Sequence, residues 1–366
     1  MDRGSRQETL HCVMPWKALH MDERDGGIFA IPCCFSWIKD SYGAIGSASL
    51  LELWNSEGAQ RIRQLIAAGR QHEICSPHCA YWMSGRYGET ALRIVEGSQE
   101  FVENQKVNLA EIQRRQPVLR SKPMLLKVLP TLRCNLRCTM CYQCNYDTNG
   151  LGEGIWREIA QLLPYTHEIA FQGGEATLDK GFRNFFDSVE LQSHRHVKIS
   201  LITNGTVLDK RLLEGLRHVK LNYIIVSLNA ATRETYARIT GKDFFERVVG
   251  NLRQLSELAH NHSHGDFILH ASFVVMRSNF HELPQFLEIA SSLGIEVQLL
   301  NVIGNRNNED IFVRTDQHET LRRVLDQASH ISTGTAKEQV DRIRIILDSH
   351  RPPIAANGGE ERRMKI

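Results

Sequence analysis

The chain has 366 residues, of which 42% are hydrophobic and 23% charged, with a formal net charge of +2. This length suffices for one large domain or two ordinary ones, and the near-neutral charge gives no electrostatic argument for binding nucleic acid or an acidic membrane. No apolar run reaches the roughly 18 residues of a membrane span, and the opening MDRGSRQETLHCVMPW lacks the apolar run of a signal peptide. We expect a cytoplasmic protein that binds neither nucleic acid nor membrane.

The nine cysteines fall into two groups, and none follows residue 144. Five lie in the N-terminal quarter and four in TLRCNLRCTMCYQCNY, residues 131–146. Cysteines used only as small hydrophobic residues would be scattered through the core, and structural disulfides are rare in the cytosol. The clustering therefore predicts metal or redox chemistry.

The first 123 residues predict two segments. Residues 1–85 are rich in Gly, Pro, Trp and Cys and predict short elements, with SLLELWNSEGAQRIRQLIAAG forming an amphipathic helix. Residues 86–123 predict a helical connector that ends at QPVLRSKPM.

From residue 124 onward, apolar strand-like runs alternate with helical patterns. The strand-like runs are MLLKVLP, EIAFQGG, VKISLITNG, NYIIVSLN, FILHASFVV and IEVQLLNVI. This alternation predicts an α/β fold with a parallel sheet, and the number of strands predicts a partial (β/α)6 TIM-like barrel over residues 124–305. A C-terminal helical extension and tail are expected over residues 306–366, with the last residues disordered.

Polar motifs follow the predicted strands at their C-terminal ends, where the chemistry of such barrels is located. CNLRCTMC follows the first strand, GGEATL the second and TNG the third, and Ser227 and Asn229 close the fourth. The CxxxCxxC triplet offers three thiolates. Structural zinc prefers four ligands, whereas an iron–sulfur cube held by three thiolates keeps one iron open. A zinc or structural cysteine site remains the alternative.

CNLRCTMCY and GGEATL resemble the CxxxCxΦC and GGE motifs of the radical S-adenosylmethionine (radical SAM) family, with Met140 at the apolar position. The resemblance covers about residues 124–305. It implies that Cys134, Cys138 and Cys141 hold a [4Fe-4S] cluster whose open iron binds SAM. An electron from the cluster, supplied by a flavodoxin- or ferredoxin-type donor, would yield a 5′-deoxyadenosyl radical that abstracts hydrogen from a C–H bond.

The same resemblance implies a set of SAM contacts. Gly173 and Gly174 would let the backbone approach the methionine moiety, and Glu175 would receive its amino group. The candidates for the ribose hydroxyls or the carboxylate are Asn204, Ser227 and Asn229, although such residues at strand ends are commonly turn or cap residues.

One family contact has no direct equivalent here. Family members often carry an arginine in an IRG-like segment, and this chain has ITG with Thr240 at that position. We therefore consider Arg238 or Arg277 as a substitute.

The N-terminal cysteines resemble a SPASM/Twitch auxiliary cluster module, in the shorter Twitch form. The shared parts are CVMPWKALHMDERDGGIFAIPCC, the ELWNS helix and the closing CSPHC. The resemblance implies a second, auxiliary [4Fe-4S] cluster on Cys12, Cys33 or Cys34, Cys75 and Cys79. Two departures are that the module precedes the barrel and that the glycine-to-cysteine spacing is one residue longer with Cys33. A zinc-ribbon-like site on Cys12, Cys33, Cys75 and Cys79 is the alternative.

Cys144 is left over by this count and is the candidate catalytic residue. Some radical SAM epimerases use such a thiol to return a hydrogen atom to the substrate, and a small buried residue is the plainer interpretation. SPASM/Twitch enzymes often modify peptides, while others dehydrogenate or epimerise sugars and related metabolites, so we expect a peptide or small-molecule substrate. The competing class is a zinc-binding structural or interaction protein without SAM chemistry.

Overall fold

The structure is a computed structural model that describes residues 12–24, 26–33, 38–76, 79, 94–141, 149–261, 267–302 and 306–349. Two compact units divide the chain. Unit 1 comprises Met1–Asn135, Gln143–Val226 and Gln254–Leu269, and unit 2 comprises Leu136–Tyr142, Ser227–Arg253 and His270–Ile366. The candidates Cys34 and Cys144 lie outside the described residues.

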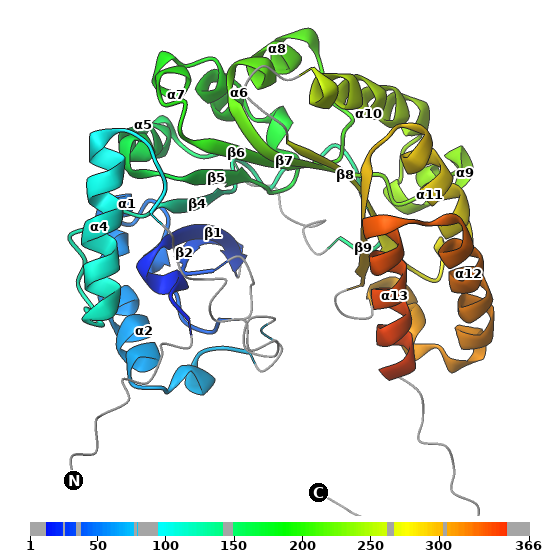
Figure 1. The fold of residues 1–366 in the computed structure, drawn as a ribbon, viewed down its shortest axis with the longest axis horizontal. Coiled ribbons are helices and arrows are strands. Elements are labelled where there is room, and N and C mark those ends of the chain that lie inside the picture. The colour runs from blue at the N-terminus through cyan, green and yellow to red at the C-terminus, as the bar shows by residue number, and fades with distance from the viewer. Residues whose placement is uncertain are drawn as a thin grey trace, which may run out of the picture. The chain divides into compact units, whose positions relative to one another are not determined.

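Unit 1 is built on a mixed sheet with the strand order β3-β2-β1-β4-β5-β6-β7. The bounds are β1 (Ala18–Arg24), β2 (Gly27–Ile31), β3 (Gly43–Ala44), β4 (Leu125–Val128), β5 (Glu168–Phe171), β6 (Lys198–Thr203) and β7 (Lys220–Ser227). β1 to β3 pair antiparallel, whereas β1 pairs parallel with β4 and the parallel pairing continues to β7. The cysteine-rich segment thus adds its strands directly to the parallel sheet, as the blue strands beside β4 in Figure 1 show.

The helices of unit 1 begin with two short helices where the sequence predicted one. Ser49 caps the first helix in a capping box with Glu52. The backbone leaves the helix at Asn55, and Ser56 caps the second helix by accepting a hydrogen bond from the backbone N–H of Ala59. The prediction of a single helix was therefore wrong, because a second capping serine interrupts the apolar pattern. The bounds are α1 (Leu50–Trp54), α2 (Glu57–Ala67), α4 (Gln99–Gln113), α5 (Glu153–Leu162), α6 (Lys180–Phe186), α7 (Val189–Ser193) and α8 (Lys210–His218).

A buried arginine fastens the N-terminal segment. Arg63 of α2 is 0% exposed. Its guanidinium donates to the backbone carbonyls of Pro15, Trp54 and Pro117 at 2.7–2.8 Å and lies 4.6 Å from the Trp54 ring centroid. These contacts join α1, α2 and the connector into one core.

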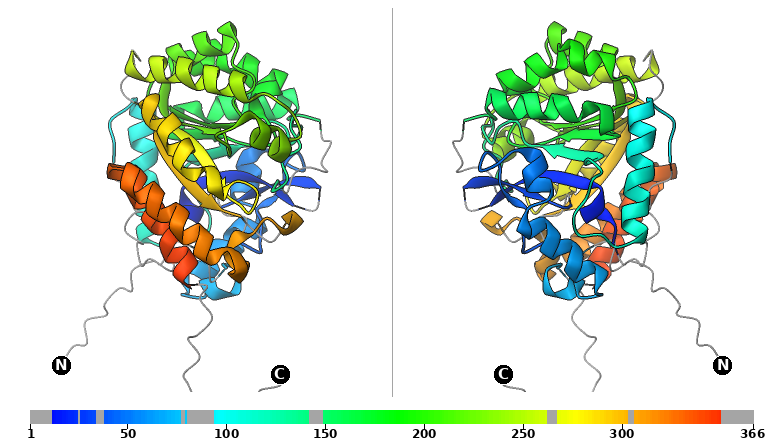
Figure 2. Two further views of the ribbon diagram at one scale, coloured as in Figure 1. Left: turned by 90° about the vertical axis from the view of Figure 1, so that its right-hand side faces the viewer. Right: turned by 90° about the vertical axis from the view of Figure 1, so that its left-hand side faces the viewer.

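Aromatic side chains pack the helical face of the parallel strands. Phe171 of β5 lies within 6.3 Å, between ring centroids, of Trp156 on α5 and of Phe182, Phe185 and Phe186 on α6. Because side chains alternate along a strand, the neighbours of Phe171 in β5 face the opposite side of the sheet. Figure 2 shows the green helices gathered on one side of these strands.

Unit 2 contains the parallel pair β8 (Ile268–Val275) and β9 (Glu296–Asn301), in the register His270 to Glu296. α13 packs on β9, and α12 packs on α11 and α13. The bounds are α9 (Arg233–Thr240), α10 (Phe245–His260), α11 (Leu283–Ser292), α12 (His318–Ile331) and α13 (Gly334–Ser349). The 3-10 turns of the chain are Met14–Trp16, Gln71–Glu73, Leu163–Tyr165, Ala176–Leu178, Phe280–Glu282, Arg306–Asn308, Ile311–Val313 and Thr315–Gln317.

Strands and helices alternate from β4 to β9, and the strands pair in parallel within each unit. This confirms the predicted α/β fold with a mostly parallel sheet, in the βα order of a partial (β/α)6 barrel. Among the described helices, none combines the length and the apolar character that crossing a membrane requires.

Candidate functional site

The two glycines of GGEATL, Gly173 and Gly174, let their own backbone lie close against the loop that carries Cys134. The backbone N–H of Gly174 donates to Thr131 at 3.0 Å, and that of Glu175 donates to Arg133 at 2.8 Å. Gly173 has a φ of +151°, and a Cβ atom there would lie 2.5 Å from the Thr131 carbonyl oxygen. These glycines therefore hold the cysteine loop in place. Their predicted contact with SAM stays a prediction.

Glu175 joins the ends of β5 and β6. Its side chain is 1% exposed. One carboxylate oxygen accepts hydrogen bonds from the Thr177 backbone N–H and hydroxyl and from the Thr203 hydroxyl, at 2.6–3.2 Å. The other accepts from the backbone N–H of Asn204 at 2.6 Å. Burial raises the pKa of Glu175 above its ordinary value, against the lowering effect of these bonds. The carboxylate is thus engaged by neighbouring residues, and its predicted bond to SAM stays a prediction.

Asn204 connects this network to Cys134. Its side-chain nitrogen lies 3.6 Å from the Cys134 sulfur and 2.8 Å from Oδ1 of Asn135. Its side-chain oxygen accepts from the Thr206 backbone N–H and hydroxyl, at 2.9 and 2.7 Å. The amide orientation is therefore fixed, and an N–H group points at the sulfur. A hydrogen bond to a ligand sulfur is one of the means by which proteins tune iron–sulfur clusters.

Cys138 and Cys141 belong to unit 2, where the cysteine loop runs beside α9. The backbone N–H groups of Arg137 and Thr139 donate to the carbonyls of Thr240 and Ile239, at 2.8 and 2.9 Å. Met140 packs against an apolar cluster formed by Ile239, Met276 and Val302. Met140 therefore anchors the loop by its side chain.

The polar candidates at the end of β7, Ser227 and Asn229, form hydrogen bonds within unit 2. Asn229 has a φ of +57° and is 4% exposed, and its side-chain oxygen accepts from the backbone N–H of Val274 at 2.8 Å. The Ser227 hydroxyl accepts from Ser272 at 3.4 Å. Asn229 thus acts as a turn residue here, and a SAM contact for either residue stays a prediction.

Thr240, at the position of the missing arginine, and the candidate substitute Arg238 both form hydrogen bonds within unit 2. The Thr240 hydroxyl donates to backbone carbonyls at 2.8 Å. Arg238 donates to the Thr235 hydroxyl and the Ser278 carbonyl, each at 2.9 Å. Arg277 is exposed.

The described N-terminal cysteines, all in unit 1, are electrostatically coupled. Burial, and then the thiols of Cys75 and Cys79, raise the pKa of Cys12 to about 12. Burial and Cys79 raise the pKa of Cys75 to about 11. Burial raises the pKa of Tyr42, and Cys33 and Cys12 raise it further. The fold therefore brings Cys12 near the CSPHC segment of Cys75 and Cys79, and it places Cys33 and Cys12 near Tyr42.

The described cysteines form neither a disulfide nor a site for a single metal ion. None of the seven described cysteines forms a disulfide. Across the described ranges, no three His, Cys, Asp or Glu side chains are arranged to hold one metal ion. Each cysteine of a four-cysteine cube binds a different iron, so the four do not converge on one point as zinc ligands do.

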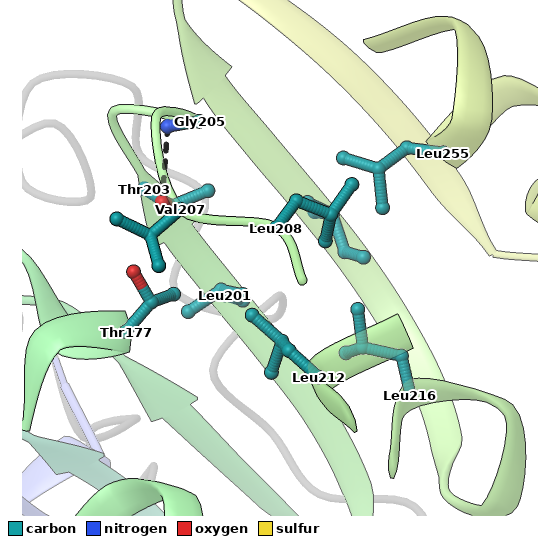
Figure 3. A pocket seen from close by; sticks show the side chains of 10 residues that line it. Thr177, Leu201, Thr203, Gly205, Val207, Leu208, Leu212, Leu216 and Leu255 are labelled. Atoms are coloured by element: carbon teal, nitrogen blue, oxygen red, sulfur yellow. Dashed lines mark hydrogen bonds between the residues drawn. The ribbon is translucent and has the colours of Figure 1, made fainter. Parts of the chain in front are cut away.

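An apolar pocket of unit 1 lies on the helical side of the sheet (Figure 3). Its polar groups include the hydroxyls of Thr177 and Thr203, and the Thr203 hydroxyl accepts from the backbone N–H of Gly205 at 3.1 Å. The remaining lining is mainly leucine, with Leu201, Leu212 and Leu255 among it. Because no titratable side chain lines this pocket, we assign it to core packing.

Sequence reasoning missed Asn135, Thr203 and Thr206, which complete the network around Cys134. Asn135 lies inside CNLRC, and Thr203 begins the TNG motif, so a survey of every amide and hydroxyl at the strand ends would have found them. Their partners lie 28 to 71 residues away in the sequence, and no local pattern shows that pairing.

Residues 128–290 match a family model described as the Radical SAM superfamily. An uncharacterized protein of Methanocaldococcus jannaschii is 27% identical over 182 residues, covering 50% of this chain and 58% of that protein. A probable GTP 3′,8-cyclase of Saccharolobus islandicus is 28% identical over 213 residues, covering 57% of this chain and 65% of that protein. The chain spans less than two thirds of the length of both relatives.

Solved structures are similar at lower identity. Streptococcus suis SuiB bound to S-adenosylmethionine has a TM-score of 0.46 and 14% identity, covering 75% of this chain and 58% of that chain. The same protein bound to the precursor peptide SuiA has a TM-score of 0.47 and 15% identity, covering 80% of this chain and 67% of that chain.

Proposed function

The chain belongs to the radical SAM superfamily through residues 128–290, and on this premise we propose that it cleaves S-adenosylmethionine reductively and abstracts hydrogen from a C–H bond of its substrate. Members of this superfamily are enzymes. Cys134, Cys138 and Cys141 would hold the [4Fe-4S] cluster. When bound, cluster and SAM supply the electron and the radical chemistry, and the protein binds, orients and excludes water.

The observation that carries this proposal is the support around Cys134. The backbone of Gly174 and Glu175 holds the preceding residues of the loop, and Asn204 points an N–H group at the sulfur. A structural zinc site in a simple loop does not need such hydrogen bonds from residues at the ends of two strands. In unit 2, Met140 and the backbone bonds to α9 fix the rest of the loop.

The auxiliary cluster is the second part of the proposal. Cys12, Cys33, Cys75 and Cys79 would bind a second [4Fe-4S] cube. The electrostatic effects of Cys75 and Cys79 on Cys12 support this, as does the position of Cys33 and Cys12 near Tyr42. Cys33 is the third ligand that we propose, with its neighbour Cys34 as the alternative. The zinc-ribbon alternative is disfavoured because no three ligands converge among the described residues.

The third part of the proposal is the class of substrate. A peptide or a small metabolite is proposed, with a flavodoxin- or ferredoxin-type electron donor. Two alternatives are a sugar or related metabolite that is epimerised or dehydrogenated with the help of Cys144, and a nucleotide, which the names of the GTP 3′,8-cyclase relatives suggest.

Iron content after anaerobic reconstitution tests the cluster assignment. Wild-type protein is expected to hold about eight irons per chain, from two cubes. Replacing Cys134, Cys138 and Cys141 by alanine should leave about four irons, and replacing Cys12, Cys75 and Cys79 should leave about four irons in the other site. Tight zinc in place of iron, or full iron in both variants, would contradict the assignment.

A further inference from the structure

A polar row crosses the side of the unit 1 sheet that faces away from the helices. In the pairing register, His20 of β1 lies opposite Lys127 of β4, Lys127 opposite Ala170 of β5, and Ala170 opposite Ser200 of β6. Phe171, the next residue along β5, packs on α5 and α6. The alternation of side chains therefore places His20 and Lys127 on the other face, next to each other.

Lys127 is a largely buried lysine that has no counter-charge among the described residues. Its side chain is only 6% exposed. In the part of the chain that the structure describes, its ammonium forms no ion pair and no hydrogen bond, and its one recorded electrostatic neighbour is His20. An unpaired charge on a largely buried residue is costly, and proteins normally pair such groups.

Three other buried charged groups of unit 1 show the contrast. Arg63 is bonded to three carbonyls, Glu111 accepts from the backbone N–H of Arg120 and the hydroxyl of Ser121, and Glu175 is bonded as described above. Lys127 differs from these groups because no described residue forms a hydrogen bond or an ion pair with its ammonium.

His20 is the second unsatisfied group of the row. Its ring is 8% exposed, and Nδ1 has no hydrogen-bond partner. In the ring tautomer that carries its proton on Nε2, Nδ1 is a hydrogen-bond acceptor. Two adjacent buried groups therefore lack partners of opposite kinds. Among the residues that the structure describes, Lys127 has no anion beside it and His20 Nδ1 has no donor.

We propose that Lys127 and His20 form a substrate subsite that binds a carboxylate or phosphate group with a neighbouring O–H or N–H donor. The anionic oxygen would lie against the Lys127 ammonium, and the donor would bond to Nδ1 of His20. The identification of this ligand as the substrate rests on the proposed function. The binding of the anion itself does not.

Anion titration of the reconstituted full chain tests this subsite. Phosphate, acetate and glycolate are titrated separately at constant ionic strength by calorimetry, against Lys127→Met and the matched surface control Lys210→Met. Wild type and Lys210→Met should bind one of the anions alike, and Lys127→Met should bind it at least about tenfold more weakly, as loss of a bond to a charged group implies. Preference for phosphate would indicate a phosphorylated substrate, and preference for acetate a carboxylate.

Two further readouts separate a binding role from a structural one. Lys127→Met should melt at or above the wild-type temperature without anion, because it removes an unpaired buried charge. Glycolate, which adds a hydroxyl donor to acetate, should bind wild type more tightly than acetate, and His20→Phe should remove that preference.

Other results would overturn the proposal. These are no anion binding by wild type, equal binding by Lys127→Met, or unfolding of Lys127→Met, which would reveal a structural partner. Since none of these assays measures SAM cleavage, failure of the subsite leaves the proposed function standing, and failure of SAM cleavage leaves the anion result intact.

Discussion

Replacing Gly174 by alanine is expected to displace the loop that carries Cys134. A Cβ atom at this position would lie 2.3 Å from the Arg133 carbonyl oxygen and 2.4 Å from that of Leu132. Both neighbours are backbone atoms of the cysteine loop, so they cannot rotate away as a flexible side chain would. The loop itself must move.

The magnitude follows from two contributions. Forcing an extra carbon into a packed site costs about 1–3 kcal/mol. The displacement also strains the hydrogen bonds from Gly174 to Thr131 and from Glu175 to Arg133, each contributing about 0.5–1.5 kcal/mol. We expect Gly174→Ala to lower the free energy of unfolding by about 2–6 kcal/mol and to reduce the iron bound at the triplet.

Urea denaturation and iron analysis after reconstitution measure the two effects. Gly154→Ala is the matched control, because a Cβ there meets nothing within 4 Å. Gly154 lies in α5, where alanine is favoured over glycine by up to about 1 kcal/mol. If Gly174→Ala is as stable as wild type and retains all its iron, then the glycine is not needed for the approach of the loop.

Two further predictions concern single side chains. Asn204→Ala should remove the N–H group that points at the Cys134 sulfur. Its loss should weaken cluster retention by about 10–100-fold and lower the reduction potential of the cluster in an EPR-monitored titration. An unchanged potential would contradict this role. Glu282 accepts from the backbone N–H groups of Ala231 and Thr232 and from the Thr232 hydroxyl, and although burial raises its pKa, these bonds hold that pKa below its ordinary value. Since a depressed pKa gives stability above the ordinary pKa that is lost as pH falls through the folded one, Glu282→Gln should cost about 1.5–3 kcal/mol at pH 7. In urea titrations the difference should shrink below about pH 4.5, and a pH-independent difference would argue against it.

The fold could be predicted from the sequence where the pattern is local. The six apolar runs after residue 124 correspond to β4 to β9 because each run is bounded by turn residues and followed by a helical pattern. The pairing of β1 with β4 could not be predicted, since it joins His20 to Lys127 across more than a hundred residues. The break between α1 and α2 was missed because the apolar spacing continues through Asn55 and Ser56.

The candidate site shows the same division. The cysteines and the GGE motif were identified from their spacing, but the partners of their side chains were not. Glu175 and Asn229 were chosen as polar groups at strand ends, and the structure shows that both form bonds to neighbouring strands. Sequence alone cannot separate a polar group that faces a ligand from one that joins two strands, because the difference depends on contacts that form only in the fold.

The central claim is tested most directly by incubating the anaerobically reconstituted, reduced protein with SAM and quantifying 5′-deoxyadenosine and methionine. The account predicts both products from wild type and from Cys75→Ala, which leaves the triplet intact, and neither product from Cys138→Ala. Absence of 5′-deoxyadenosine from wild type that holds iron at the triplet, or its formation by Cys138→Ala at the wild-type rate, would contradict the assignment.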